Sequence, residues 1–295
     1  MAGKRILIIN ADDLGHTRGI NQAIRQCAVA GMLSSATLMA NGPAFEDAVA
    51  MVRNTEALGV GVHLVLTELS SVSPPARIQG LIDERGKLPS NPWKLTASLL
   101  GGGTGRDAIR LELSSQISKV LDYGLQPTHL DSHQHVHVLP QVLEVVIELA
   151  RRFSIPWIRN PFDETPFFHF ARLVDKKRTG SFCLQHLKAK AIRVCRSSFL
   201  GRARCSGVRL PDHFFGISLT GIWNEAAMVQ LCDELPPGIT EWMVHPGYCD
   251  QDLLRSGSRL SGQRETEKDL LLSPAMQEHL ARERITLSSF GAEVT

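Results

Sequence analysis

Short apolar runs alternate with amphipathic stretches along most of the chain. Residues 4–10 form an apolar run that ends in polar side chains, which is typical of a strand buried on both faces. Over residues 18–30 the apolar positions are spaced three and four apart and Gly31 follows, which predicts a helix. Further strands are predicted at 35–39, 59–66, 128–131, 155–159, 239–244 and 285–288. Further helices are predicted at 45–52, 106–123, 139–153, 224–231, 263–272 and 274–283.

Two segments interrupt this alternation. Residues 68–93 are rich in serine, proline and glycine and predict a long loop, of the kind that often forms a lid or a binding loop. Residues 162–204 are helical around Ile192 and indicate an insertion, and two short strand candidates follow at 207–210 and 214–219. Strands that alternate with helices at this pace imply βαβ units and a mainly parallel sheet. We therefore expect one α/β domain over residues 1–295, with loop insertions near 68–95 and 162–206.

The composition is that of an ordinary globular protein, with 43% hydrophobic and 21% charged residues. The net charge of +2 does not suggest a nucleic-acid or membrane-surface partner, and the arginine-rich stretch 193–209 is interpreted as a solvated face. No apolar run approaches the roughly 18 residues of a membrane span. Residues 1–5 lack the apolar core of a signal peptide. We expect a cytoplasmic protein whose six cysteines are reduced thiols.

Polar side chains follow almost every predicted strand. In a parallel α/β barrel the C-terminal strand ends meet on one face, where active sites are assembled. Residues far apart in the sequence would therefore converge there. The residues are Asp12, Asp13, His63, Asp131, His133, His135, His137, Arg159, Asp212, His213 and His245.

Asp12 and Asp13 are adjacent carboxylates at the end of a buried strand, where they repel each other and resist desolvation. A bound cation would remove that cost, and the alternative is a surface turn or a helix cap. His133, His135 and His137 alternate along the chain, so in an extended segment all three would face one side. The alternative for them is a solvated or hydrogen-bonded strand end.

Imidazoles with a carboxylate suit Zn²⁺ and other divalent first-row ions, and an oxygen-richer site with waters also suits Mg²⁺. An Asp-His-His set leaves coordination positions open for water and substrate, and frees a second carboxylate to act as a general base. His63, taken alone, is more simply a hydrogen-bonded core residue. His245 heads the turn His-Pro-Gly-Tyr, which would hold its imidazole rigidly at a strand end, and the alternative is a histidine that caps this turn.

Four motifs resemble those of the YdjC-like carbohydrate deacetylases, a group that includes chitooligosaccharide deacetylases and the hopanoid-biosynthesis deacetylase. They are NADDLG at 10–15, GVHL at 61–64, THLDSHQHVH at 128–137 and HPGY at 245–248. The motifs match in order over most of the chain, and coverage is weakest at 162–204. Leu14 stands where the family often has phenylalanine.

The resemblance implies an α/β fold, a distorted (β/α) TIM-like barrel of the glycoside hydrolase and deacetylase type. It also implies removal of acetyl groups from N-acetylated sugars or glycans. It implies that a divalent ion, Mg²⁺ or Zn²⁺, is bound by three residues. These three are Asp13, His63 and His133. It further implies Asp12 as the catalytic base and His245 as the general acid. Arg159 and His135 match the family's motif regions and are expected to contact the substrate, and His137 matches without a role.

Two other functions stay open on the sequence alone. The same metal site would also serve to cleave another amide, an ester or a phosphoester. Only Arg18 and Arg159 lie near the motifs, however, and phosphate sites usually enlist more cationic groups. A non-catalytic sugar- or metal-binding protein on this scaffold would have no need of the base and the acid. A homodimer is compatible with the sequence, but no feature indicates one.

Overall fold

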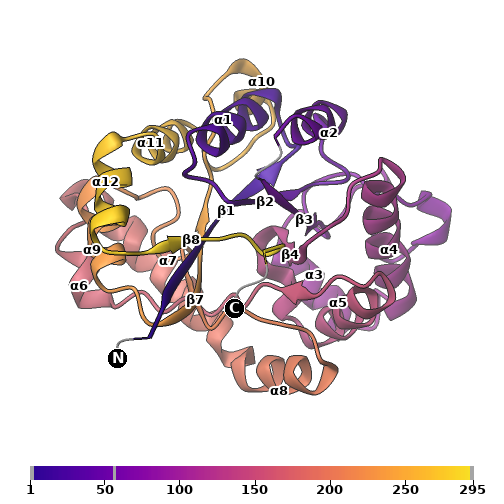
Figure 1. The fold of residues 1–295 in the computed structure, drawn as a ribbon. Coiled ribbons are helices and arrows are strands. Elements are labelled where there is room, and N and C mark those ends of the chain that lie inside the picture. The colour runs from indigo at the N-terminus through magenta and orange to yellow at the C-terminus, as the bar shows by residue number, and fades with distance from the viewer. Residues whose placement is uncertain (1–2, 56–57, 293–295) are drawn as a thin grey trace.

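The computed structural model describes residues 3–55 and 58–292. One parallel sheet forms its centre, with strands in the order β5-β4-β3-β2-β1-β7-β6 and β8 pairing with β1. The strands are β1 (Arg5–Leu14), β2 (Ser35–Leu38), β3 (Gly59–Leu64), β4 (His129–Ser132), β5 (Trp157–Ile158), β6 (His213–Phe215), β7 (Gly238–Val244) and β8 (Thr286–Leu287). The sheet curls and helices surround it, so the expected distorted (β/α) TIM-like barrel is confirmed (Figure 1).

A short bridge links the two ends of the strand order. Trp157 in β5 forms an isolated parallel bridge with Arg209, which precedes β6. The amide of Ile158 donates to the carbonyl of Arg209 at 3.0 Å, and the amide of Arg209 donates to the carbonyl of Pro156 at 2.8 Å. The barrel is therefore closed at this point by a loop rather than by a full strand pair.

The helices pack around the sheet, and several of them begin at a capping residue. They are α1 (Arg18–Val29), α2 (Phe45–Arg53), α3 (Pro92–Leu100), α4 (Arg106–Asp122), α5 (Pro140–Arg152), α6 (Phe167–Ala171), α7 (Thr179–Ile192), α8 (Arg196–Ser206), α9 (Glu225–Asp233), α10 (Gln251–Arg255), α11 (Gly262–Leu271) and α12 (Pro274–Arg282). Thr17, Asn91 and Asn224 accept a backbone amide of the first turn of α1, α3 and α9, which is the usual role of an N-cap. Among the described residues, no helix combines the length and the apolar character that crossing a bilayer demands.

Most predicted elements are present, and the differences have local causes. The predicted strand at 207–210 is wrong, because α8 continues to Ser206 and only the isolated bridge at Arg209 follows. The strand predicted at 214–219 ends at Phe215, because Gly216 adopts φ 143° and a turn follows. The region near Ile192 is helical as predicted, as part of α6 to α8.

β1 holds the centre of the sheet and carries the candidate site at its C-terminal end. It pairs with β2 on one side and with β7 on the other, and all its residues after Arg5 are buried. The loop that follows is held by the amide of Gly15, which donates to Oδ1 of Asn21 in α1 at 2.7 Å. The end of β1 is thereby fixed beside the ends of β3, β4 and β7.

Candidate active site

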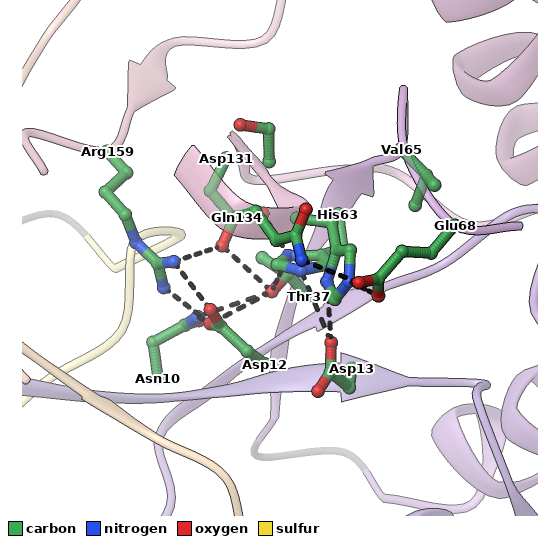
Figure 2. Close-up of polar contacts among 12 residues, drawn as sticks. Asn10, Asp12, Asp13, Thr37, His63, Val65, Glu68, Asp131, Gln134 and Arg159 are labelled. Carbon is green, nitrogen blue, oxygen red and sulfur yellow. Dashed lines mark hydrogen bonds and ion pairs between the residues drawn. The ribbon is translucent and has the colours of Figure 1, made fainter. Parts of the chain in front are cut away.

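Asp12 and Asp13 are adjacent in the chain but face different partners (Figure 2). Asp13 adopts a left-handed backbone with φ 66°, a conformation uncommon for residues other than glycine. The Asp13 carboxylate lies beside His63 and His133, whereas the Asp12 carboxylate lies beside Arg159. Both aspartates are buried, so each must be compensated by the groups around it.

The Asp13 carboxylate is the meeting point of two histidines and an arginine. Its Oδ1 lies 3.5 Å from Nε2 of His63 and 3.3 Å from Nδ1 of His133, and its Oδ2 accepts from Arg264 of α11 at 2.5 Å. Burial raises the pKa of Asp13, but Arg264 and the two histidines bring that pKa well below its usual value. One ligand atom from each of Asp13, His63 and His133 lies within 4.8 Å of the other two, close enough for one cation to meet all three.

A second carboxylate orients each of these histidines. Nδ1 of His63 lies 2.8 Å from Oδ1 of Asp131, and Nε2 of His133 lies 3.0 Å from Oε2 of Glu68. Histidines that bind metals are commonly held in this way through their other ring nitrogen. Burial lowers the pKa of His133, but Asp13 and Glu68 outweigh it and raise that pKa to about 10. This position therefore attracts positive charge, which a metal ion would supply in place of a proton.

Asp12 forms a buried ion pair with Arg159. Nη2 and Nη1 of Arg159 lie 2.6 Å and 2.8 Å from the two carboxylate oxygens of Asp12, and Nδ2 of Asn10 donates to Oδ1 at 3.1 Å. Burial raises the pKa of Asp12, but the charge of Arg159 and its hydrogen bonds bring that pKa far below its usual value. Asp12 is therefore ionised throughout the physiological range of pH.

Arg159 is completely buried and forms ion pairs with three carboxylates. Besides Asp12, it lies 2.8 Å from Oδ2 of Asp131 and 2.8 Å from Oε1 of Glu241. Burial raises the pKa of Glu241 to about 7, even though Arg159 lowers it. Asp12, His63 and Asp131 also have ligand atoms within 4.8 Å of one another, but both carboxylates of that group are paired with Arg159, whereas in the Asp13 group only Asp13 is paired with an arginine, Arg264. The Asp13 group is thus the better candidate for a cation.

His245 follows β7 and reaches the same face of the barrel. Its backbone amide donates to Oε2 of Glu267 at 2.6 Å, while its ring Nδ1 is buried without a hydrogen-bond partner among the described residues. Burial lowers the pKa of His245 to about 4, although the charges of Asp12 and Asp13 oppose this shift. The imidazole is therefore neutral at pH 7 in the absence of a ligand.

The three alternating histidines do not face one side, so that expectation is wrong. Residues His133–Val138 form a 3-10 helical segment, and Gln134 and His135 adopt left-handed backbones with φ 55° and 56°. Only His133 reaches Asp13. The ring centroid of His135 is 6.0 Å from that of Phe214, and Nδ1 of His137 lies 2.6 Å from Oγ of Ser132 in a buried pair.

Asp212 and His213 lie outside the site. They stand at the start of β6 rather than at its end, and Oδ2 of Asp212 accepts from the amide of Ile239 at 2.9 Å, near the start of β7. His213 pairs with Glu164 at 2.7 Å. The strand-end rule fails for these two because the predicted strand at 207–210, which they would follow, is absent, and His213 is the first residue of β6.

The sequence interpretation missed several residues that complete the site. Arg264, Glu68, Glu241, Glu267 and His16 all lie within it or touch its members. Glu68 lies two residues beyond the predicted strand at 59–66, so the strand-end rule would have included it. Arg264 and Glu267 carry no such signal, because they come from a helix that reaches the face of the barrel only in the folded chain. The expectation that only Arg18 and Arg159 lie near the motifs was wrong for the same reason, because Arg264 also contacts Asp13.

Fold and site together define an α/β-barrel protein with a carboxylate–histidine centre at the C-terminal ends of its strands. The family model of the YdjC-like proteins matches residues 6–282, so the chain belongs to that family. The expected family is thus confirmed.

Curated relatives and one solved structure extend over nearly the whole chain. A carbohydrate deacetylase of Geobacillus stearothermophilus is 33% identical over 287 residues, which cover 97% of each chain. A chitooligosaccharide deacetylase of Escherichia fergusonii is 36% identical over 292 residues, with 97% of this chain and 98% of that one covered. A crystal structure from Enterococcus faecalis V583, described as a candidate cellobiose-phosphate cleavage protein, superposes with a TM-score of 0.74. It is 24% identical and covers 97% of this chain and 98% of its own, which supports the fold alone.

Proposed function

We propose that this protein is a metal-dependent carbohydrate deacetylase, which hydrolyses the amide of an N-acetylated sugar and releases acetate. The observation that carries the proposal is that two adjacent aspartates contact different groups. Asp13 lies against two histidines, while Asp12 is held apart by Arg159. Relatives over nearly the whole chain are named carbohydrate deacetylase or chitooligosaccharide deacetylase, which supports the same reaction.

The residues around Asp13 fit a divalent ion. One carboxylate and two imidazoles suit Zn²⁺, and with water ligands the site would also accept Mg²⁺. Asp13, His63 and His133 would hold the ion, while Asp131 and Glu68 would keep the two imidazoles in place. When bound, the ion would polarise the acetyl carbonyl and lower the pKa of a coordinated water.

Asp12 acts as the general base in this proposal. It accepts a proton from the attacking water, whose oxygen then forms a bond to the acetyl carbonyl carbon. Arg159 keeps the carboxylate ionised and fixes its direction. Because Arg159 is fully buried and engaged by three carboxylates, we assign it this positioning role in place of the expected contact with substrate.

His245 acts as the general acid. As the carbon–nitrogen bond breaks, its imidazolium donates a proton to the leaving sugar amine, and acetate is left on the acyl side. The low pKa of His245 makes its charged form a strong acid but leaves little of that form at pH 7, so the imidazolium must form in the loaded site, where the carboxylate of Asp12 favours it. His135 lies beside Phe214 at the same strand ends, and a contact with the sugar stays a prediction for it.

Acetate release tests the function directly. The purified protein is incubated with N-acetylated chitooligosaccharides and other N-acetylated glycans, with and without a chelator, and acetate is measured enzymatically. We expect release that stops with the chelator and returns with Zn²⁺ or Mg²⁺.

Binding of a glycan without acetate release would indicate a non-catalytic protein instead. Release of phosphate from a sugar phosphate would indicate a phosphoesterase, which Arg159 and Arg264 argue against because both are already paired with aspartates.

A further inference from the structure

The segment 167–209, which contains α6 to α8, differs in charge from the rest of the chain. It holds eleven lysine and arginine residues against one acidic residue, Asp175, so it carries +10 while the whole chain carries only +2. Most of these cations are exposed. Such a concentration creates a positive field over one part of the surface, which the neutral overall balance conceals.

One side of α7 is apolar and exposed. We call it the α7 face and define it by Cys183, Leu184, Leu187, Ala191 and Val194, whose spacing of three and four places them along one side of the helix and its extension. The exposed fractions of Leu184, Leu187 and Val194 are 54%, 66% and 86%. Clusters of exposed large apolar side chains mark surfaces that other molecules cover.

The opposite side of α7 already packs on the barrel. Phe182, Gln185 and Ala189 are buried there, so the helix is apolar on two sides and only one of them is used within the described chain. Cations flank the unused side, with Lys176 and Lys177 before the helix and others along it. An apolar strip bordered by lysine and arginine is the pattern of a helix that lies on an anionic membrane surface.

We propose that the α7 face docks on a bilayer that contains anionic lipids. The apolar strip would enter the boundary between headgroups and acyl chains, and the flanking cations would lie among the headgroup phosphates. A second copy of this chain fits less well, because a two-fold interface would bring the same cations against each other. A nucleic acid would satisfy the cations but would leave Leu187 and Val194 without an apolar partner.

The barrel side of α7, opposite the α7 face, is close to the rim of the candidate active site. With its amide turned to accept, Oε1 of Gln185 lies 3.1 Å from both terminal nitrogens of Arg259. Leu184, Gln185 and Arg259 line a cavity of about 110 Å³. Burial lowers the pKa of Arg259, while the nearby carboxylate of Glu68, which contacts His133, raises it. Docking would therefore place α7 between the membrane surface and the rim of the site.

Vesicle flotation tests the proposal without any readout of catalysis. The full chain is mixed with vesicles of phosphatidylcholine, with or without phosphatidylglycerol, at low and at high salt. We expect the protein to float with the anionic vesicles at low salt and to be released by salt. Lys176→Glu with Lys177→Glu should weaken binding about tenfold or more, since each cation near the surface contributes on the order of 1 kcal/mol. Leu187→Ser with Val194→Ser should also weaken it.

Matched substitutions on α1 provide the control. Arg25→Glu removes an exposed cation and Val29→Ser removes a valine that is 73% exposed, and both should leave vesicle binding unchanged. Circular dichroism and melting temperature will show whether each variant is folded.

Three results would overturn the proposal. The first is no binding of the wild-type protein to anionic vesicles. The second is equal loss of binding in the α1 and α7 variants. The third is self-association or binding to RNA that depends on the α7 face while vesicles are not bound.

Discussion

Replacement of Asp12 by asparagine removes the proposed base with almost no change in shape. The amide oxygen can still accept from Arg159, and Arg159 keeps Asp131 and Glu241 as partners. None of the proposed metal ligands, Asp13, His63 and His133, is altered. The variant therefore separates proton transfer from metal binding and from folding.

The expected loss is large compared with the side effects. A general base contributes about 10²–10⁴-fold to a rate, which is on the order of 3–5 kcal/mol in the activation barrier. Breaking a buried ion pair outright costs about 3–5 kcal/mol of stability, but here Arg159 keeps two carboxylates and a hydrogen bond to the new amide. We expect turnover to fall by at least about a hundredfold, and the melting temperature to fall without loss of the fold at assay temperature.

Acetate release from a chitooligosaccharide gives kcat and KM, and equilibrium dialysis with Zn²⁺ gives the metal content. Glu241→Gln is the matched control, because Glu241 touches the same guanidinium but its pKa near 7 makes a neutral amide a small change. It should keep turnover within about tenfold of wild type. If Asp12→Asn keeps near wild-type turnover with metal bound, the base has been misassigned. If it loses the metal instead, Asp12 is a ligand.

Three further predictions concern other residues. His245→Ala should lower acetate release from a sugar about 10²–10⁴-fold. It should have little effect on hydrolysis of 4-nitroacetanilide, whose leaving group needs less protonation. Equal losses on both substrates would refute the acid role. Glu68→Gln should weaken Zn²⁺ binding about tenfold or more by releasing His133, measured by dialysis, whereas Glu84→Gln in the same loop should not. Burial lowers the pKa of His137 to about 3, so its neutral form stabilises the fold above pH 6.5 and this contribution is lost as the pH falls toward 3. Between pH 7 and pH 5 the loss is about 2 kcal/mol, and urea unfolding of His137→Asn should show a correspondingly weaker dependence on pH.

Periodicity and the strand-end rule were enough to predict the barrel and most of the central residues. β1, β3 and β7 are mainly apolar, and such runs are recognisable in the sequence because both faces of the sheet are covered. Asp12, Asp13 and His63 lie at the C-terminal ends of β1 and β3, and His245 directly follows β7, so their convergence was predictable. The match to the YdjC-like family model confirms the family, and the roles of the individual site residues stay proposals.

The other residues of the site and the helices of the insertion depend on contacts that local sequence patterns do not encode. Gln134 and His135 adopt left-handed backbones, which no alternation of residues predicts, so the three histidines could not be placed correctly. Arg264 lies on an ordinary amphipathic helix and is distinguished only by its contact with Asp13 across 251 positions of the chain. α7 is apolar on two sides, which blurs the periodic signal of an insertion that indicated helix only around Ile192.

The span of the Arg264–Asp13 contact has a consequence for how the chain matures on the ribosome. All three proposed metal ligands belong to the first 133 residues, whereas His245 and Arg264 belong to the last fifth of the chain. Contacts between such distant parts form late, because they require a large loop to close. A nascent chain will therefore carry every ligand for the ion before it carries the acid or the arginine that braces Asp13. The order of synthesis therefore separates the proposed ligands from β7 and α11, which hold β1 and Asp13 in place.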